Sequence, residues 1–318
     1  MIWPPWPPDG IASEDNRHQV VITLGLYCVS QVLASGGKSL TTTLIHPTAV
    51  IHSGARLHPT VKVGPYAVIG EQVTIGPGTE IGAHVVIDGH TTLGAHNRIF
   101  PGAAIGLEPQ DLKYAGEITP VQIGDHNLIR ECVTINRPTT ADAVTRLGSH
   151  NLLMAYSHVA HNCILEDQVV IANSVALAGH VHIEAWARIS GLVGIHQFVH
   201  IGRYAYIGGL SRIDRDVPPF TMVNGNPALV RGLNQVGLQR AGLTDQNDGQ
   251  DYRQLKQAYR MVYRSGSSLA EALSQLEPWG DNNLVRHFGQ FLRDSSQQPH
   301  RRGATPSRKR SSRSAGAD

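Results

Sequence analysis

The histidines that could do chemistry in this chain form three close pairs: His158 with His161, His180 with His182, and His196 with His200. Counting 18 residues on from His161 reaches Gly179, beside His180, and counting 36 reaches Gln197, beside His196. If segments 18 residues apart stack on one another, His161, His180 and His196 meet near one corner, within roughly 10 Å along the stacking axis. A neutral imidazole there could accept a proton or bind a metal ion near pH 7.

Three interpretations of this cluster follow from the residue types. The first is a set of surface histidines, which we prefer for any single one such as His182 or His200. The second is a zinc site with three histidine ligands. The third is a general base for acyl transfer, which typically contributes about 10²- to 10⁴-fold, with backbone N–H groups at a corner glycine stabilising the tetrahedral oxyanion.

The element that must position these histidines is a six-residue repeat. An aliphatic residue recurs at every sixth position, without a miss, at Leu147, Leu153, Val159, Leu165, Ile171, Leu177, Ile183, Ile189, Ile195, Ile201, Ile207 and Ile213. The same phase runs upstream from Ile45 to Ile105 and returns at Ile123, Ile129 and Ile135. Helices repeat at 3.6 residues and strands at 2, so a fixed period of six indicates a solenoid.

Each hexad is interpreted as a short strand plus a corner. A small or β-branched residue precedes the aliphatic one by two positions, as at Val169 and Val175, and a glycine often follows it, as at Gly64 and Gly202. We expect that glycine to give the backbone freedom to bend. Three hexads close one triangular coil, so residues 18 apart stack about 4.8 Å from one another. The pattern resembles the hexapeptide-repeat proteins, and this resemblance implies a left-handed parallel β-helix; the period alone does not determine the hand.

The rest of the chain divides by composition and period. We predict a β-helix over 45–219 with inserted loops at 107–122 and 139–146, an α-helical domain over 220–298, and a basic, disordered tail over 299–318. Pro218 and Pro219 end the strands, and Ser268 with Glu271 forms a capping box. Residues 1–44 do not fit the repeat and are interpreted as a disordered extension or a start assigned too far upstream. A signal peptide is disfavoured by acidic residues early in this segment, which is also too short for a membrane span.

The charge balance gives no sign of nucleic-acid binding by the folded part. The chain has 27 Lys and Arg against 25 Asp and Glu, but six basic residues and one acid follow Pro299, which leaves 21 against 24. Cys28, Cys132 and Cys163 show no paired spacing, so neither a disulfide framework nor a zinc motif is indicated. A reducing, cytoplasmic setting is expected.

From Leu44 to about Leu292 the chain closely resembles the UDP-N-acetylglucosamine O-acyltransferase family, which begins lipid A synthesis in Gram-negative bacteria. The motifs that carry the resemblance are QDLKYAG at 110–116, NLLM at 151–154, HVAH at 158–161, LAGHV at 177–181, HQF at 196–198, DVPP at 216–219 and YRSG at 263–266. Together these motifs are more specific than the hexad, which many acyltransferases and nucleotidyltransferases share.

The resemblance implies a role for each matching residue. His161 is the general base for the glucosamine 3-hydroxyl, and the Gly179 amide is the oxyanion donor. The substrate is held by Gln110, Asp111, Lys113, His158, His180, His196 and Gln197, and its nucleotide by Asn234 and Arg240. Gly209, roughly 13 Å beyond His161 along the axis, leaves the groove open for a long acyl chain. No metal or cofactor is implied.

The resemblance also implies the partners. They are an acyl carrier protein that donates a 3-hydroxyacyl group, UDP-N-acetylglucosamine as acceptor, and two further copies of the chain in a homotrimer with active sites between subunits. Three positions depart from the family pattern, because Val236 replaces an acid, Ala241 replaces a second arginine and Asn136 replaces a frequent histidine. How the uridine and phosphates are held is therefore open.

Four alternatives stay open beside this interpretation. The N-acyltransferase of lipid A synthesis would need a globular uridine-binding domain before the β-helix, and residues 1–44 are too short and proline-rich to form one. Another hexapeptide acyltransferase could use coenzyme A. A zinc enzyme similar to the γ-class carbonic anhydrases would place three histidines on the same fold. A non-catalytic scaffold would have no use for His161, Asp111 and Lys113 together.

Overall fold

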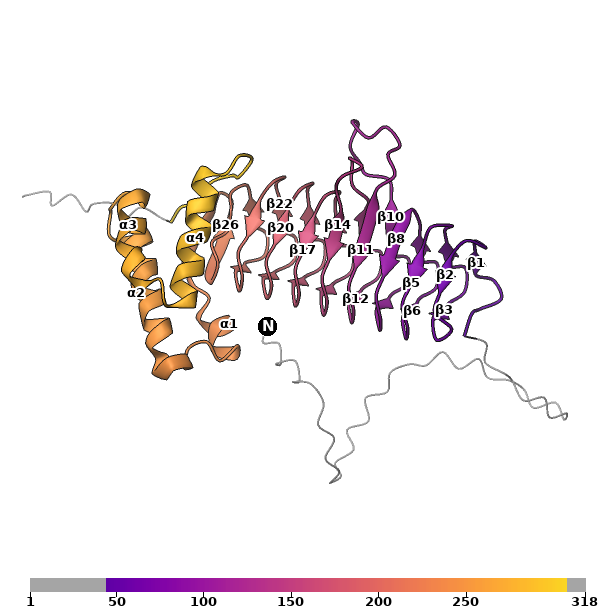
Figure 1. Cartoon of the computed structure of the whole chain (residues 1–318), viewed down its shortest axis with the longest axis horizontal. Coiled ribbons are helices and arrows are strands. Elements are labelled where there is room, and N and C mark those ends of the chain that lie inside the picture. Colours follow the sequence, from indigo (N-terminus) through magenta and orange to yellow (C-terminus); the bar gives the residue numbers. More distant parts are fainter. Residues whose placement is uncertain (1–43, 308–318) are drawn as a thin grey trace, which may run out of the picture. The chain divides into compact units, whose positions relative to one another are not determined.

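The computed structural model describes residues 44–307, so the predictions for 1–43 and 308–318 lie outside the described part of the chain. Within it, very short strands form three parallel sheets along a prism (Figure 1). The nine-stranded sheet contains β1 (Val50–Ile51), β4 (Val68–Ile69), β7 (Val86–Ile87), β10 (Ala104–Leu107), β13 (Thr134–Asn136), β16 (His158–Val159), β19 (Ala176–Leu177), β22 (Gly194–Ile195) and β25 (Arg212–Ile213).

The other two faces repeat the same arrangement. The eight-stranded sheet contains β2 (Arg56–Leu57), β5 (Thr74–Ile75), β8 (His90–Leu93), β11 (Pro120–Ile123), β14 (Thr145–Leu147), β17 (Ile164–Leu165), β20 (His182–Ile183) and β23 (His200–Ile201). The ten-stranded sheet contains β3 (Lys62–Val63), β6 (Glu80–Ile81), β9 (Arg98–Ile99), β12 (Leu128–Ile129), β15 (Leu152–Leu153), β18 (Val170–Ile171), β21 (Arg188–Ile189), β24 (Tyr206–Ile207), β26 (Thr221–Gly225) and β27 (Ala228–Leu233).

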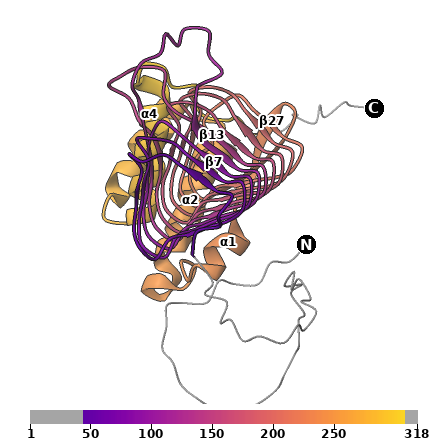
Figure 2. The ribbon, with the colours of Figure 1, turned by 90° about the vertical axis from the view of Figure 1, so that its right-hand side faces the viewer.

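The three sheets enclose one aliphatic core with a triangular cross-section (Figure 2). Where no loop intervenes, strands pair in register 18 residues apart, as Val159 does with Leu177, which confirms the period of three hexads per coil. Across the two loops the separation grows to 30 and 24 residues. The aliphatic residue of nearly every hexad is buried, and Ile171 and Ile183 are fully so. Ile45 is 43 % exposed because the described chain places no further coil beneath it.

The prediction that the glycine after each aliphatic residue bends the corner is wrong. Except for Gly106, these glycines have ordinary φ, and the left-handed corner positions are filled by other residues, such as Tyr66 (φ 57°) and His96 (φ 54°). The glycines are needed for space, because a Cβ on Gly64 would lie 2.9 Å from the backbone N of Ala83 in the next coil. Close stacking of coils, and not backbone freedom, requires them.

Two loops leave the solenoid where the hexad pattern breaks. The longer one joins β10 to β11 and projects from the prism (Figure 1). Arg137 braces it from β13's end, donating from Nε to the Tyr114 hydroxyl at 3.0 Å and pairing with Glu108 at 3.2 Å. The shorter loop joins β13 to β14. Both loops therefore lie beside the nine-stranded sheet's middle coils.

The C-terminal part differs from the purely helical domain predicted from residue 220. The strands β26 and β27 form an antiparallel hairpin that extends the ten-stranded sheet beyond Pro219, because Met222 and Val223 still fit the register of β24. The helices α1 (Gln235–Arg240), α2 (Gln250–Arg264), α3 (Leu269–Leu276) and α4 (Asn283–Gln297) follow, with 3₁₀ turns at Gln246–Gly249 and Glu277–Trp279. The predicted capping box of Ser268 and Glu271 is present.

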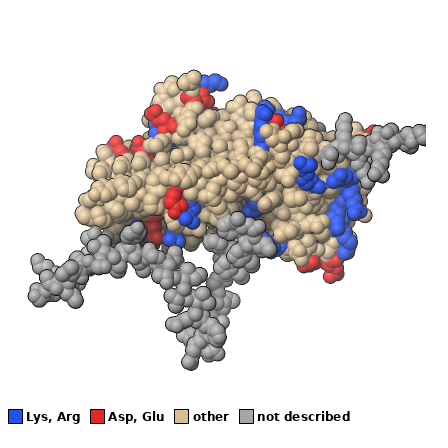
Figure 3. All heavy atoms as spheres, turned by 180° about the vertical axis from the view of Figure 1, so that it is seen from behind, with Lys and Arg blue, Asp and Glu red and all other residues tan. Residues whose placement is uncertain are grey.

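The helices pack around a second core that includes Leu255, Phe288 and Leu292. On the side seen in Figure 3, Lys and Arg side chains gather at the end of the molecule that carries these helices, whereas the coils are largely uncharged. None of the helices in residues 44–307 is long and apolar enough to cross a membrane.

Residues 299–307 are ordered, so the predicted disordered tail does not begin at 299. This segment returns to the solenoid, where Ala304 pairs with Asp216 and Ser307 with Val230. The carboxylate of Asp216 is fully buried and accepts from Arg301 Nε at 2.7 Å. A basic segment that neutralises a buried acid cannot be recognised from composition alone, which is why its order was missed.

Candidate active site

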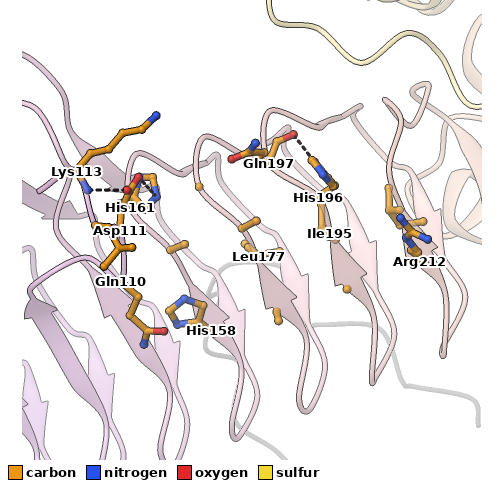
Figure 4. A pocket seen from close by; sticks show the side chains of 17 residues that line it. Gln110, Asp111, Lys113, His158, His161, Leu177, Ile195, His196, Gln197 and Arg212 are labelled. Atoms are coloured by element: carbon orange, nitrogen blue, oxygen red, sulfur yellow. Dashed lines mark hydrogen bonds and ion pairs between the residues drawn. The ribbon is translucent and has the colours of Figure 1, made fainter.

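A cavity of about 830 Å³ opens on the outer surface of the nine-stranded sheet, beneath the longer loop (Figure 4). Its floor follows from the register, because His158, Ala176, Gly194 and Arg212 stack at successive 18-residue steps on β16, β19, β22 and β25. Ala160, Ala178 and Gly179 complete the floor. Small side chains over several coils therefore make a trough, with His158 near one end and Arg212 at the other.

The protonation of His161 is determined by Asn162. The Asn162 Oδ1 atom accepts from the backbone N–H of Thr139 at 3.2 Å and lies 2.7 Å from His161 Nδ1. Because a backbone N–H can only donate, the Asn162 atom is an acceptor, and Nδ1 of His161 must carry the proton. The neutral ring therefore presents an unprotonated Nε2, which is the form of imidazole that acts as a base.

Asp111 lies on the other side of that nitrogen. Its Oδ2 is 3.6 Å from His161 Nε2, and its Oδ1 accepts from the Lys113 backbone N–H at 3.0 Å. The latter contact holds the carboxylate in a tight turn of the longer loop. A carboxylate at this distance stabilises the ring once Nε2 has gained a proton.

Gly179 lies against the ring of His161. A Cβ at residue 179 would lie 2.5 Å from Nε2 of His161, so any side chain there would displace the ring. Its backbone N–H donates to no group within residues 44–307 and is free to bind a ligand. The glycine is thus required by space and leaves a donor beside the base.

The neighbouring histidines are held neutral. Burial lowers the pKa of His158, and the nearby His161 lowers it further; Thr134 Oγ1 lies 2.7 Å from its Nδ1. Burial likewise lowers the pKa of His180, whose ring stacks on Phe198 and meets His161 edge to face. These rings can donate or accept hydrogen bonds without adding charge near His161.

The structure brings eight of the predicted site residues together around the cavity: Gln110, Asp111, Lys113, His158, His161, Gly179, His196 and Gln197. Four others do not line it. His180 packs edge to face against His161, and Gly209 lies outside the cavity at the corner before β25. Asn234 caps α1 through Gly237 and donates to the Tyr204 carbonyl, and Arg240 ends α1.

Sequence reasoning missed several residues that shape the site. Asn162 and Thr139, which set the proton on His161, carry no motif of their own. Ala176, Gly194 and Arg212 could have been found, because each lies a multiple of 18 residues beyond His158. Within residues 44–307, no three His, Cys, Asp or Glu side chains lie close enough together to hold a metal ion.

Comparison with known proteins agrees with this geometry. Residues 216–305 match the family model for domain 2 of UDP N-acetylglucosamine O-acyltransferase, and residues 54–89 match the model of six bacterial transferase hexapeptide repeats. The parallel solenoid is accordingly the left-handed β-helix that the resemblance implied.

Relatives and solved structures give the same result. The chain is 58% identical over 210 residues to the acyl-[acyl-carrier-protein]–UDP-N-acetylglucosamine O-acyltransferase of Gloeothece citriformis, which covers 66% of this chain and 75% of that protein. It is 52% identical to the enzyme of the same name from Anaeromyxobacter, over 78% of this chain and 96% of the relative. The crystal structure of Francisella novicida UDP-N-acetylglucosamine acyltransferase aligns with a TM-score of 0.77 at 36% identity, over 82% of this chain and 94% of that one. On these grounds, the chain belongs to the family of acyl-[acyl-carrier-protein]–UDP-N-acetylglucosamine O-acyltransferases.

Proposed function

We propose that this enzyme transfers a 3-hydroxyacyl group from acyl carrier protein to the 3-hydroxyl of UDP-N-acetylglucosamine, with His161 as general base. The observation that carries the proposal is the fixed tautomer of His161, a residue that lines the cavity and whose unprotonated Nε2 lies 3.6 Å from Asp111 Oδ2. The names of the two relatives described above state transfer between these two substrates.

The geometry supports a direct attack. Nε2 of His161 takes the proton of the sugar hydroxyl as that oxygen bonds to the thioester carbonyl carbon, and Asp111 stabilises the resulting imidazolium. The carbonyl oxygen becomes an oxyanion within reach of the free Gly179 N–H. Collapse of the tetrahedral intermediate breaks the carbon–sulfur bond, and the proton on His161 passes to the departing thiolate. The enzyme ends the cycle with His161 neutral again.

The remaining assignments concern substrate binding. Gln110, Lys113, His158, His196 and Gln197 line the cavity and are proposed to hold the sugar. Gly209 is proposed to leave room for a long acyl chain. Gly209, Asn234 and Arg240 do not line the cavity of their own chain. We therefore propose a homotrimer in which a neighbouring subunit completes each site. We also propose that the enzyme acts in the cytoplasm.

The first test replaces the base. His161→Ala should lower kcat by a hundredfold or more, because loss of a general base typically costs about 10²- to 10⁴-fold. The assay measures acyl transfer from 3-hydroxyacyl-acyl carrier protein to UDP-N-acetylglucosamine in metal-free buffer with a chelator. His182→Ala is the matched control, because His182 lies on the eight-stranded sheet away from the cavity, and it should retain activity within a few-fold.

Two results would overturn the assignment. Near-normal turnover by His161→Ala would remove His161 as the base. An inactive wild-type enzyme that co-purifies with zinc would favour the zinc-enzyme hypothesis for the histidine corner.

A further inference from the structure

The trough has a feature that the proposed reaction at His161 does not use. Its floor is open in the middle, where Ala176 and Gly194 are both exposed, and a Cβ at Gly194 would meet no atom within 4 Å. Beyond these two residues the next position in the same column is Arg212. A long side chain with a positive charge therefore follows two small ones, at the end of the cavity farthest from the loop (Figure 4).

Arg212 is free, whereas two arginines of the C-terminal segment, Arg301 and Arg302, are engaged. Its side chain makes no ion pair or hydrogen bond with any residue from 44 to 307, although Asp214 lies only two positions away. By contrast, Arg301 is bound to the buried Asp216, and Arg302 donates from Nε to the Asp214 carbonyl at 3.1 Å. An unpaired guanidinium that lines a cavity is available to a ligand.

Its distance from the base limits which part of a ligand it can meet. Arg212 lies three strand spacings from His158, or about 14 Å along the axis. The reacting hydroxyl and carbonyl must lie at His161, so Arg212 cannot contact the reacting atoms. Both substrates of the proposed reaction carry phosphate groups away from those atoms. A guanidinium binds phosphate oxygens in a bidentate manner and remains charged at all physiological pH values.

We propose that Arg212 binds a phosphate group of a bound substrate and thereby fixes that substrate's direction along the trough. The proposal rests on the proposed function, because that function supplies the phosphates. Two sources fit this chemistry: the diphosphate of UDP-N-acetylglucosamine, and the phosphodiester that joins the acyl carrier protein to its thiol-bearing arm. Arg212 is a positioning residue, since it holds a substrate away from the site of reaction.

The test separates KM from kcat for each substrate. Arg212→Gln keeps a polar side chain and removes the charge, and it should raise the KM of one substrate roughly 10-fold or more, because hydrogen bonds to charged groups are among the stronger ones. The kcat at saturation should change less than about threefold. Arg212→Lys keeps the charge but cannot bind phosphate in a bidentate manner, and it should restore part of the lost affinity. Arg56→Gln removes an exposed arginine on β2, outside the cavity, and should leave both KM values unchanged.

Direct binding distinguishes the two sources and does not depend on turnover. Calorimetric titration with UDP should weaken in Arg212→Gln if the nucleotide diphosphate is the ligand. If UDP binds normally and only titration with 3-hydroxyacyl-acyl carrier protein weakens, the phosphodiester is the ligand. Binding of both within twofold of wild type, or a fall in kcat with unchanged KM values, would overturn the proposal. A wild-type enzyme that binds these ligands but transfers no acyl group would instead overturn the proposed function.

Discussion

The two ends of the nine-stranded sheet have the same strand arrangement but differ in the residues that point outward. In the early coils, the outward column is Val50, Val68 and Val86, stacked in register. In the late coils the same column continues as His158, Ala176, Gly194 and Arg212. Beneath both lie buried aliphatic residues, such as Ile69 and Ile195. The inward residues are thus interchangeable along the prism, whereas the outward ones are not.

This difference shows how a solenoid separates stability from chemistry. Because strand residues alternate between faces, one position of each hexad can fill the core while its neighbour is free to vary. The early coils stay inert on this face, and the late coils replace valine with small and titratable residues. The trough lies where two small residues, Ala176 and Gly194, stand between the larger His158 and Arg212.

The largest expected effect contrasts inward and outward residues on one strand of the early coils. Ile69→Ala on β4 should destabilise the protein by about 2–5 kcal/mol, since Ile69 is 1 % exposed and its loss leaves a cavity. Val68→Ala, its neighbour, should cost less than about 1 kcal/mol, because Val68 is 40 % exposed. Denaturant unfolding followed by circular dichroism measures both. Equal losses would show that the outward column also carries stability.

An effect of intermediate size is expected from Gly179 in the late coils. Gly179→Ala should lower kcat about a hundredfold, because the new Cβ overlaps the His161 ring and misplaces the base. Its unfolding midpoint should stay close to that of the wild type. The matched control is Gly232→Ala on β27, where a Cβ meets nothing within 4 Å. Normal turnover by Gly179→Ala would mean that the position of the His161 ring does not limit the reaction.

The smallest expected effect is on the pH dependence of the free energy of unfolding, to which the histidines of the late coils contribute. Burial lowers the pKa values of His158 and His180, so just below the ordinary histidine pKa of about 6.5 the unfolded chain binds more protons than the folded protein. Stability should therefore be complete above that pH and fall as the pH drops through it. The loss should be on the order of 1 kcal/mol per pKa unit for His158, and smaller for His180, which is more exposed and therefore screened by solvent.

Unfolding experiments at pH 7.5 and 5.5 measure this loss. His158→Gln should reduce the difference in unfolding free energy between the two pH values. An unchanged difference would assign the pH dependence to groups outside the trough. Glu184 gives a separate loss at lower pH. Burial raises the pKa of this carboxyl, but its contacts with His200 and His287 outweigh that effect and hold the pKa far below its usual value.

Much of the architecture was predictable because the repeat can be counted directly along the sequence. The period of six predicted the short strands up to β25, and 18-residue steps brought His161 close to Gly179 and His180. It did not predict how the sheets continue across the two loops, where partner residues lie 30 or 24 positions apart, or the hairpin of β26 and β27. The same arithmetic would have identified Arg212, which is 54 residues beyond His158. The role of the corner glycines was mistaken, since both a bend and a close approach of coils favour glycine in the sequence, and only φ values separate them.

By itself, the sequence determined the prism, the inward and outward faces, and the residues that could do chemistry, because each depends on spacing along one chain. Only the tertiary structure decided how the loops return to those residues. Asp111 reaches His161 across 50 positions, Thr139 reaches Asn162 across 23, and Arg301 reaches Asp216 across 85. These contacts have no period, and they depend on hydrogen bonds between segments that meet only after the coils have stacked.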